Sequence, residues 1–186
     1  MPLSFEQLNT LLALGTVALQ IATVILFLFL FLRKKSASAE GFSVFISRWG
    51  LLLSFLLTLA ATALTLYYSE VLGFVPCGLC WLQRIFLYPL PVLFAVALWK
   101  KENRIADYAI VLSVFGALVA LYQHYLQMGG TDVLPCPATG ATADCSVRIL
   151  LEFGYITFPL MAFSIFVFLI ALMLHVRRES STVRAI

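Results

Sequence analysis

Residues 74–99 read FVPCGLCWLQRIFLYPLPVLFAVALW, and the second part of this stretch decides the class of fold. Residues 81–99 carry a single charged side chain, Arg84, in a mainly apolar run. A helix that crosses a bilayer needs about 20 predominantly apolar residues, and its backbone polar groups must be satisfied within the segment because lipid offers no partners. The stretch is therefore predicted to be a membrane-spanning helix that begins beside two cysteines.

The rest of the 186-residue chain has the same character. It is 62% hydrophobic and only 11% charged, with a mean hydropathy of +1.02, which excludes an ordinary soluble domain. We expect an all-α membrane protein, a four-transmembrane-helix bundle with an additional N-terminal transmembrane helix. The five predicted spans are residues 10–32, 49–70, 81–99, 105–126 and 155–176.

Positive charges indicate how the five spans are oriented. Lys and Arg gather in short cytoplasmic loops, and all but Arg84 and Arg148 lie on one side of a five-helix serpentine. This distribution predicts an extracytoplasmic N-terminus, a cytoplasmic C-terminus and four extracytoplasmic cysteines. The net charge of +3 could suggest a protein that binds nucleic acid, but this distribution of the charges argues against it. The residues on the cytoplasmic side are Arg33, Lys34, Lys35, Arg48, Lys100, Lys101, Arg104, Arg177, Arg178 and Arg184.

The first span is expected to be a retained helix rather than a cleaved signal. A secretory signal peptide has a basic start and a short apolar core, whereas residues 1–10 contain no Lys or Arg and the apolar run continues to Leu32. The polar segment 34–43, KKSASAEGFS, is predicted to be a linker that makes this helix an appendage. The predicted divisions are an extra helix with its cytoplasmic linker (1–48), a four-helix bundle (49–176) and a cytoplasmic tail (177–186).

Cys77 and Cys80 form a CxxC pair in front of the third span. Disulfides persist outside the cytosol, so two outward pairs of cysteines are consistent with paired redox chemistry. If the helix starts near Cys80 or Trp81, its N-terminal N–H groups and dipole favour a thiolate on Cys80. Pro89 and Pro91 are expected to kink the helix and to open space beneath the pair.

Arg84 lies one helical turn after Cys80, on the same face. An arginine within a membrane span is costly and usually faces a polar cavity or a partner. Arg84 is thus a candidate for orienting an oxygen-bearing electron acceptor or for stabilising the Cys80 thiolate. The alternative is a side chain that extends to the outer headgroups.

Cys136 and Cys145 lie in a polar loop of small residues. A disulfide that closes such an exposed loop tends to be labile or catalytic, and a stabilising staple is the alternative. Pro135 and Pro137 favour an extended chain around Cys136, which suits the groove of a partner thiol protein. The segment 146–156 is then expected to lie along the membrane surface and to bring Cys145 back toward the first pair.

Zinc is the main alternative use for four cysteines. The spacing C-x2-C-x55-C-x8-C matches no common zinc ribbon, which argues against a metal site. His124, near the outer end of the fourth span, is a candidate for proton transfer or for holding an acceptor, with a packed histidine as the alternative. His175, at the inner end of the last span, is interpreted as interfacial.

Four motifs surround these residues: PCGLCWLQR (76–84), YPLP (88–91), YQHYLQ (122–127) and FGYITFPLMA (153–162). Together they resemble the DsbB/BdbC-type disulfide bond formation proteins over residues 49–176, and the short second loop is closer to the BdbC branch. The resemblance implies a thiol:quinone oxidoreductase of the bacterial plasma membrane. Residues 10–32 are not part of the usual four-helix plan of that family.

The resemblance also implies a relay. A reduced thioredoxin-fold oxidase of the DsbA type would attack the Cys136–Cys145 disulfide at Cys136. Cys145 would then attack the first pair through a Cys77–Cys145 bridge. Cys80 would be released as a thiolate facing a membrane quinone, either ubiquinone or menaquinone.

Arg84 matches the quinone-contacting arginine of the family, and His124 matches a family histidine near the same site. Two alternatives remain beside this interpretation. A vitamin K epoxide reductase-like quinone reductase also has four helices and two cysteine pairs, but its loop pair precedes the membrane CxxC pair, whereas here CxxC comes first. A non-catalytic membrane protein with metal-binding or structural cysteines would leave Arg84 beside Cys80 without an evident use.

Overall fold

The computed structural model describes residues 5–32, 37–102, 104–134, 136 and 142–184. Over these residues the chain is helical, apart from turns and isolated bridges near the cysteines. Five helical stretches are long and apolar enough to cross a membrane, so the predicted fold class is confirmed. The elements are α1 (Phe5–Leu32), α2 (Ala37–Leu66), the π-helix η2 (Tyr67–Val71), α3 (Gly78–Leu87), α4 (Pro89–Lys100), α5 (Ile105–Gln127) and α6 (Phe158–Arg184).

Two of the predicted segments are more helical than expected. The predicted linker is already part of α2 from Ala37 onward, and the predicted tail continues α6 as far as Arg184. Each of these segments continues a long apolar helix. Extending an existing helix is easier than starting one, because each added residue forms one more backbone hydrogen bond. The basic residues 33–35 lie outside the described part of the chain.

The third span consists of two helices. α3 ends at Leu87 and α4 begins at Pro89, so the kink predicted from the prolines is a break at Tyr88. Proline suits the first position of a helix because its missing N–H would have no partner there. The predicted start of this span was wrong, because α3 begins at Gly78 with Cys77 as its N-cap, before Cys80.

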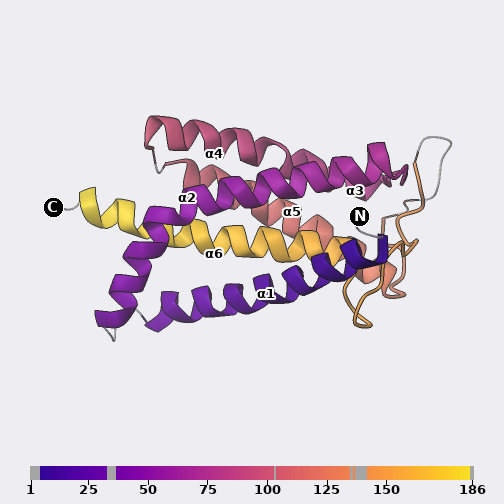
Figure 1. The fold of residues 1–186 in the computed structure, drawn as a ribbon, viewed down its shortest axis with the longest axis horizontal. Coiled ribbons are helices and arrows are strands. Elements are labelled where there is room, and N and C mark those ends of the chain that lie inside the picture. Colours follow the sequence, from indigo (N-terminus) through magenta and orange to yellow (C-terminus); the bar gives the residue numbers. More distant parts are fainter. Residues whose placement is uncertain (1–4, 33–36, 103, 135, 137–141, 185–186) are drawn as a thin grey trace.

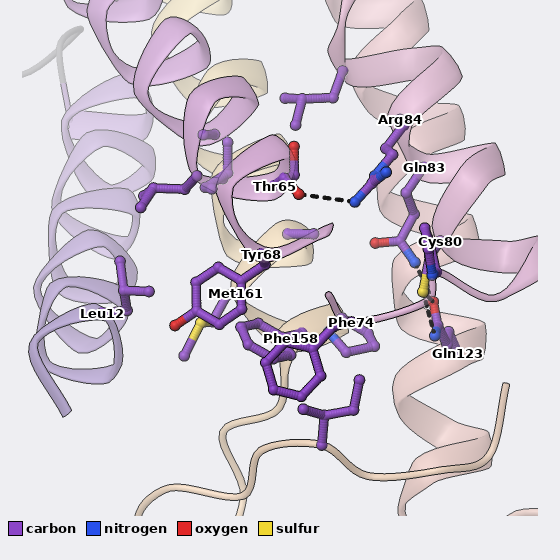
Figure 2. A pocket seen from close by; sticks show the side chains of 18 of the residues that line it. Leu12, Thr65, Tyr68, Phe74, Cys80, Gln83, Arg84, Gln123, Phe158 and Met161 are labelled. Atoms are coloured by element: carbon purple, nitrogen blue, oxygen red, sulfur yellow. Dashed lines mark hydrogen bonds between the residues drawn. The ribbon is translucent and has the colours of Figure 1, made fainter. Parts of the chain in front are cut away.

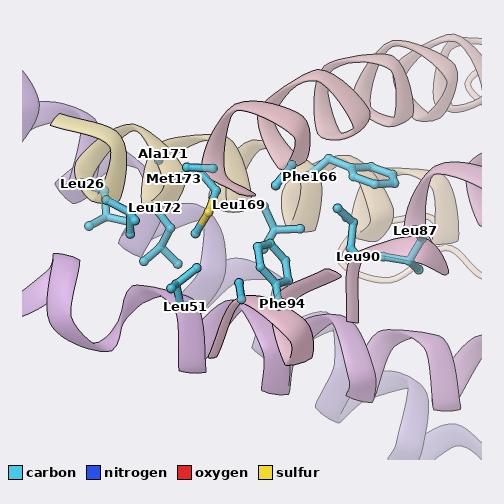
Figure 3. Close-up of a cluster of buried hydrophobic side chains, with 14 of the residues drawn as sticks. Leu26, Leu51, Leu87, Leu90, Phe94, Phe166, Leu169, Ala171, Leu172 and Met173 are labelled. Atoms are coloured by element: carbon cyan, nitrogen blue, oxygen red, sulfur yellow. The ribbon is translucent and has the colours of Figure 1, made fainter. Parts of the chain in front are cut away.

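α6 is the central helix of the bundle. Over an apolar 18-residue window of its membrane span 61% of the residues are buried, against 22–33% over the corresponding windows of the other four spans. Its buried side chains, Phe166, Leu169, Leu172 and Met173 among them, meet those of α2 and α4 in the main core (Figure 3). A Cβ at Gly116 of α5 would overlap the Phe166 ring, so the small residue lets α5 approach α6 closely, as predicted for this stretch.

α1 packs along α6 rather than standing apart from the bundle (Figure 1). The amide of Gln20 donates to Ser164 Oγ at 3.0 Å, and Arg178 donates to the carbonyl oxygen of Leu30 at 3.1 Å. His175 Nε2 lies 3.1 Å from the carbonyl oxygen of Leu26 and is fully buried. The interpretation of His175 as interfacial was therefore wrong, because this side chain joins α6 to α1.

All four cysteines lie at one end of the bundle, where α3 begins and where the segment between α5 and α6 is folded (Figure 1). The α4–α5 turn, which carries Lys100, Lys101 and Arg104, and the C-terminal end of α6 lie at the opposite end. These basic residues and the cysteines are thus separated along the bundle axis. That the cysteine end faces outward stays a prediction.

Candidate active site

The first cysteine pair is built into the start of α3. Cys77 has an extended backbone and acts as the N-cap, and its sulfur accepts a hydrogen bond from the backbone N–H of Cys80 at 3.2 Å. Pro76, immediately before it, has no backbone N–H to donate and therefore prevents a helix from running through this position. The two sulfurs are free thiols and lie 2.7 Å apart. A CxxC spacing at a helix start therefore brings both sulfurs into contact.

Gln123 of α5 joins the two sulfurs from the other side. Its amide nitrogen donates to Cys77 Sγ at 3.0 Å and to Cys80 Sγ at 3.2 Å. Gln83, one turn into α3, donates to the amide oxygen of Gln123 and so fixes which way that amide points. Both glutamines are buried. Amide hydrogens directed at two sulfurs stabilise negative charge there.

Sequence reasoning missed both glutamines, although a signal was present. A buried polar side chain within a membrane span is costly and is a candidate for function by default. Gln83 lies inside the quoted motif at 76–84 and Gln123 inside that at 122–127. Nothing in their spacing reveals that they meet, because they come from different helices.

The two thiols of the pair are not equivalent. The side-chain hydrogen bond with Cys80 and, after it, burial raise the pKa of the Cys77 thiol well above its ordinary value. Cys77 is 3% exposed, whereas Cys80 is half-buried and borders the cavity described below. Cys77 is therefore the more deeply buried thiol of the pair and the one whose proton is held more tightly.

The second pair is a disulfide between Cys136 and Cys145 that packs directly on the first pair. Ala143 forms a parallel bridge with Cys77, and a Cβ at Gly78 would lie 3.4 Å from Cys136 Sγ. Cys145 is 1% exposed, and Cys136 is half-buried. The expectation that the chain brings Cys145 back to the first pair is confirmed.

Tyr122 of α5 holds the start of this loop. Its hydroxyl oxygen accepts hydrogen bonds from the backbone N–H groups of Leu134, at 2.8 Å, and Val133, at 3.2 Å. The predicted role of Pro135 and Pro137 concerns residues outside the described part of the chain. The loop is thus tied to α5 two residues before Cys136.

Arg84 is buried, with 8% of its surface exposed. Its guanidinium donates to the carbonyl oxygen of Thr65 at 2.9 Å and lies 5.0 Å from the centroid of the Trp81 ring. A side chain extended to the headgroups would be exposed instead, so the geometry favours the interpretation in which Arg84 faces a cavity. The carbonyl at Thr65 lies just before the π-helix η2, where the regular α-helical hydrogen bonding of α2 ends.

A cavity of about 390 Å³ lies beside the first pair, between α1, α2, α3 and α6. Figure 2 shows Cys80, Gln83 and Arg84 on one side of it and Leu12 on the other. The polar groups gather at the α3 side, and the remaining lining is mainly apolar. The apolar lining includes Leu12, Leu19, Leu57, Ala61, Leu64, Leu87, Phe158, Met161, Ile165 and Phe166.

His124 lies outside the lining of this cavity. Its Nδ1 is 2.9 Å from the hydroxyl of the fully buried Thr157, which ties α5 to the residue just before α6. Its neighbours Gln123 and Gln127 line the cavity in its place. This contact supports the packed-histidine alternative over the acceptor-holding one.

No group of three or more His, Cys, Asp or Glu side chains in the described ranges is arranged to hold a metal ion. Two of the four cysteine sulfurs are joined in the Cys136–Cys145 disulfide. The arrangement that the structure does contain is a disulfide, a thiol pair and a cavity, in that order. Such a succession can pass electrons by thiol–disulfide exchange.

The chain is similar in sequence to known proteins. The family described as "Disulfide bond formation protein DsbB" matches residues 47–176. Disulfide bond formation protein C of Bacillus subtilis (strain 168) is 33% identical over 131 residues, which cover 69% of this chain and 92% of the relative. A probable disulfide formation protein of Metapseudomonas resinovorans is 35% identical over 133 residues, covering 70% of this chain and 91% of the relative.

A third relative, the SPbeta prophage-derived disulfide bond formation protein B of Bacillus subtilis (strain 168), is 39% identical over 112 residues. Those residues cover 60% of this chain and 74% of the relative. No solved structure matches the chain. The family match begins at residue 47, so α1 and the start of α2 lie outside it.

Proposed function

Because the chain belongs to the DsbB family of disulfide bond formation proteins, we propose that it re-oxidises a DsbA-like thioredoxin-fold oxidase and passes the electrons to a membrane quinone. Family membership makes it a membrane protein that acts in disulfide formation. The choice of electron donor and acceptor is the proposal. The cysteine end of the bundle is taken to face the extracytoplasmic side of a bacterial plasma membrane, with the C-terminus in the cytoplasm, because the basic residues of the α4–α5 turn and of the C-terminal part of α6 lie at the opposite end.

The order in which the four sulfurs are buried is the observation that supports this proposal most. Cys136 is half-buried, Cys145 and Cys77 are buried in one cluster, and Cys80 borders the cavity. A partner protein can reach the first sulfur, whereas a membrane-dissolved acceptor can reach the last. The two buried sulfurs lie between them, where only intramolecular exchange takes place.

The exchange balances as follows. A thiolate of the reduced partner attacks Cys136, which forms a mixed disulfide and releases Cys145 as a thiolate; the second partner thiol then displaces Cys136 and leaves an oxidised partner. Cys145 attacks Cys77 of an oxidised inner pair and releases Cys80, and Cys136 then attacks Cys145 to restore the loop disulfide. The inner pair has then gained two electrons and is reduced. This is the state of Cys77 and Cys80 in the structure, where both are free thiols.

The α3 side of the cavity supplies groups that suit a quinone headgroup. Arg84 provides a positive charge and hydrogen-bond donors for a carbonyl oxygen, and Cys80 provides the sulfur from which the electrons leave. Gln123 stabilises charge on the sulfurs, and Cys77 holds a proton of the pair. When bound, the quinone supplies the two-electron oxidation that returns the inner pair to a disulfide and takes up two protons.

A coupled assay tests the proposal. The purified protein is mixed with a reduced DsbA-type oxidase and with ubiquinone or menaquinone, and quinone reduction is followed by absorbance. We expect reduction that depends on both the partner and Cys80, with Cys80→Ser as the inactive control. Quinone reduction at the background rate, with a folded protein and a competent partner, would contradict the proposed function. Comparison of the two quinones also identifies the acceptor.

A further inference from the structure

α1 forms one wall of the cavity although it precedes the part of the chain that the family matches. Figure 2 shows Leu12 of α1 facing the cavity from the side opposite Arg84 and Cys80. The electron-transfer end of the cavity is thus made by α3 and α5, and its far wall is made by a helix from outside the matched region. The α1 residues that line the cavity are Leu11, Leu12, Gly15, Thr16 and Leu19.

A buried polar face of α1, which borders the cavity at Thr16, fixes the helix in this position. Asn9, Thr16 and Thr23 are spaced seven residues apart, so they lie on one face, and all three are buried. The Tyr68 hydroxyl donates to Asn9 Oδ1, and Gln20 donates to Ser164 of α6. Thr16 and Thr23 donate to the carbonyl oxygens of Leu12 and Leu19 within α1, whereas Asn9 and Gln20 bond to other elements of the bundle. Amide side chains on a membrane helix are costly when they face lipid, so these two bonds favour the packed position of α1.

The cavity has two chemically different parts. Cys80, Gln83 and Arg84 make one side polar, whereas the side toward α1 is lined mainly by aliphatic and aromatic groups. The one α1 hydroxyl in the lining, that of Thr16, donates to the carbonyl oxygen of Leu12 at 2.8 Å. Leu11 lines the cavity and is 53% exposed, so the α1 edge opens toward the surface that faces lipid. A ligand with a polar head and a flexible apolar tail fits this division, with the tail leaving along α1.

We propose that α1 holds the isoprenoid tail of the quinone while the headgroup lies between Cys80 and Arg84. This inference rests on the proposed function, because it concerns the acceptor of that same site. α1 then contributes to affinity for prenylated quinones and has no direct part in the electron transfer. Its contribution is apolar burial, which scales with the tail surface that it covers.

Gly15 offers a way to test this wall without breaking the packing. It lines the cavity, and a Cβ at Gly15 would meet no atom within 4 Å. The variant Gly15→Phe therefore places a ring in the space assigned to the tail. Ala18→Phe is the matched control, because Ala18 lies on the same helix, is exposed and does not line the cavity.

Binding is measured on the resting, full-length protein, so that it does not depend on turnover. The probes are menaquinone with a short isoprenoid tail and menadione, its tailless headgroup, and the readout is quenching of tryptophan fluorescence. We expect Gly15→Phe to weaken menaquinone binding about tenfold, a factor that corresponds to about 1.4 kcal/mol. Menadione binding, and both affinities of Ala18→Phe, are expected to stay at the wild-type values.

Two results would overturn the inference. If Gly15→Phe weakens both probes equally, α1 affects the headgroup site or the fold rather than the tail. If it weakens neither, the tail does not run along α1, as when a lipid acyl chain occupies that wall. Failure of the proposed function looks different, because the wild-type protein would then bind the probes without reducing them in the coupled assay.

Discussion

Gln123 provides the sharpest test of how the inner cysteine pair works. In the variant Gln123→Leu, the side chain keeps a similar size but loses the amide that donates to Cys77 Sγ at 3.0 Å and to Cys80 Sγ at 3.2 Å. Hydrogen bonds from an amide favour the reduced sulfurs over the disulfide, because negative charge develops on the sulfurs when the pair is reduced. Their loss should therefore make the inner pair harder to reduce.

The size of the effect follows from the number of contacts. One amide group serves both sulfurs, so we count it as one hydrogen bond to a charged group, worth about 1.5–3 kcal/mol. For a two-electron couple about 1.4 kcal/mol corresponds to about 30 mV, so the reduction potential of the Cys77–Cys80 pair should fall by about 30–60 mV. Gln83 should give a smaller change in the same direction when it is replaced by Leu, because it acts only by orienting Gln123.

The measurement is an equilibrium titration of the purified protein in thiol–disulfide buffers, with the two cysteines trapped by alkylation. Gln127→Leu is the matched control, because Gln127 is buried on the same helix but donates to the carbonyl oxygen of Val147 at 3.0 Å. A shift below about 10 mV for Gln123→Leu, or an equal shift for the control, would refute the reasoning, since one hydrogen bond to a charged group implies several times that value.

Three further predictions follow from the site. In Cys145→Ser the remaining thiol, Cys136, should attack the disulfide of an oxidised DsbA-type partner and form a mixed disulfide; Cys136→Ser should form none, because its remaining thiol, Cys145, is buried. Non-reducing gels can show this, and equal trapping by both variants would contradict the assigned roles. Arg84→Ala should raise the quinone KM about tenfold, or about 1.4 kcal/mol, and unchanged steady-state kinetics would separate Arg84 from the acceptor. Gly116→Val should lower the free energy of unfolding by about 1–3 kcal/mol because the new side chain overlaps the Phe166 ring; an unchanged thermal unfolding temperature would contradict this.

The membrane class and the number of spans could be predicted from the sequence alone. An apolar run of sufficient length can satisfy its backbone polar groups in lipid by forming a helix, and this constraint acts on each segment separately. The pairing of Cys77 with Cys80 and the break at Tyr88 could also be predicted from local sequence, because a helix start and a proline act on their immediate neighbours. The start of α3 at Gly78 rather than near Cys80 depended on the Cys77 sulfur as a cap, which spacing does not reveal.

Contacts between distant segments were decided by the tertiary structure. Gln123 contacts the sulfurs and Gln83 although it lies 40 residues after Gln83, on another helix. Its neighbour in the sequence, His124, points instead to Thr157. A rotation of one residue on a helix moves a side chain by about 100°, so the sequence around YQHYLQ does not show which member faces the cysteines. Helix packing makes that choice.

α1 shows the same division most clearly. Its length and apolar character predicted a membrane helix, and the polar run after it suggested an appendage. The position along α6, with Leu12 and Gly15 facing the cavity, depended on polar groups such as Asn9 finding partners on other helices. Hydropathy determines whether a segment enters lipid, whereas only the meeting of side chains from separate helices determines which wall of a site it forms.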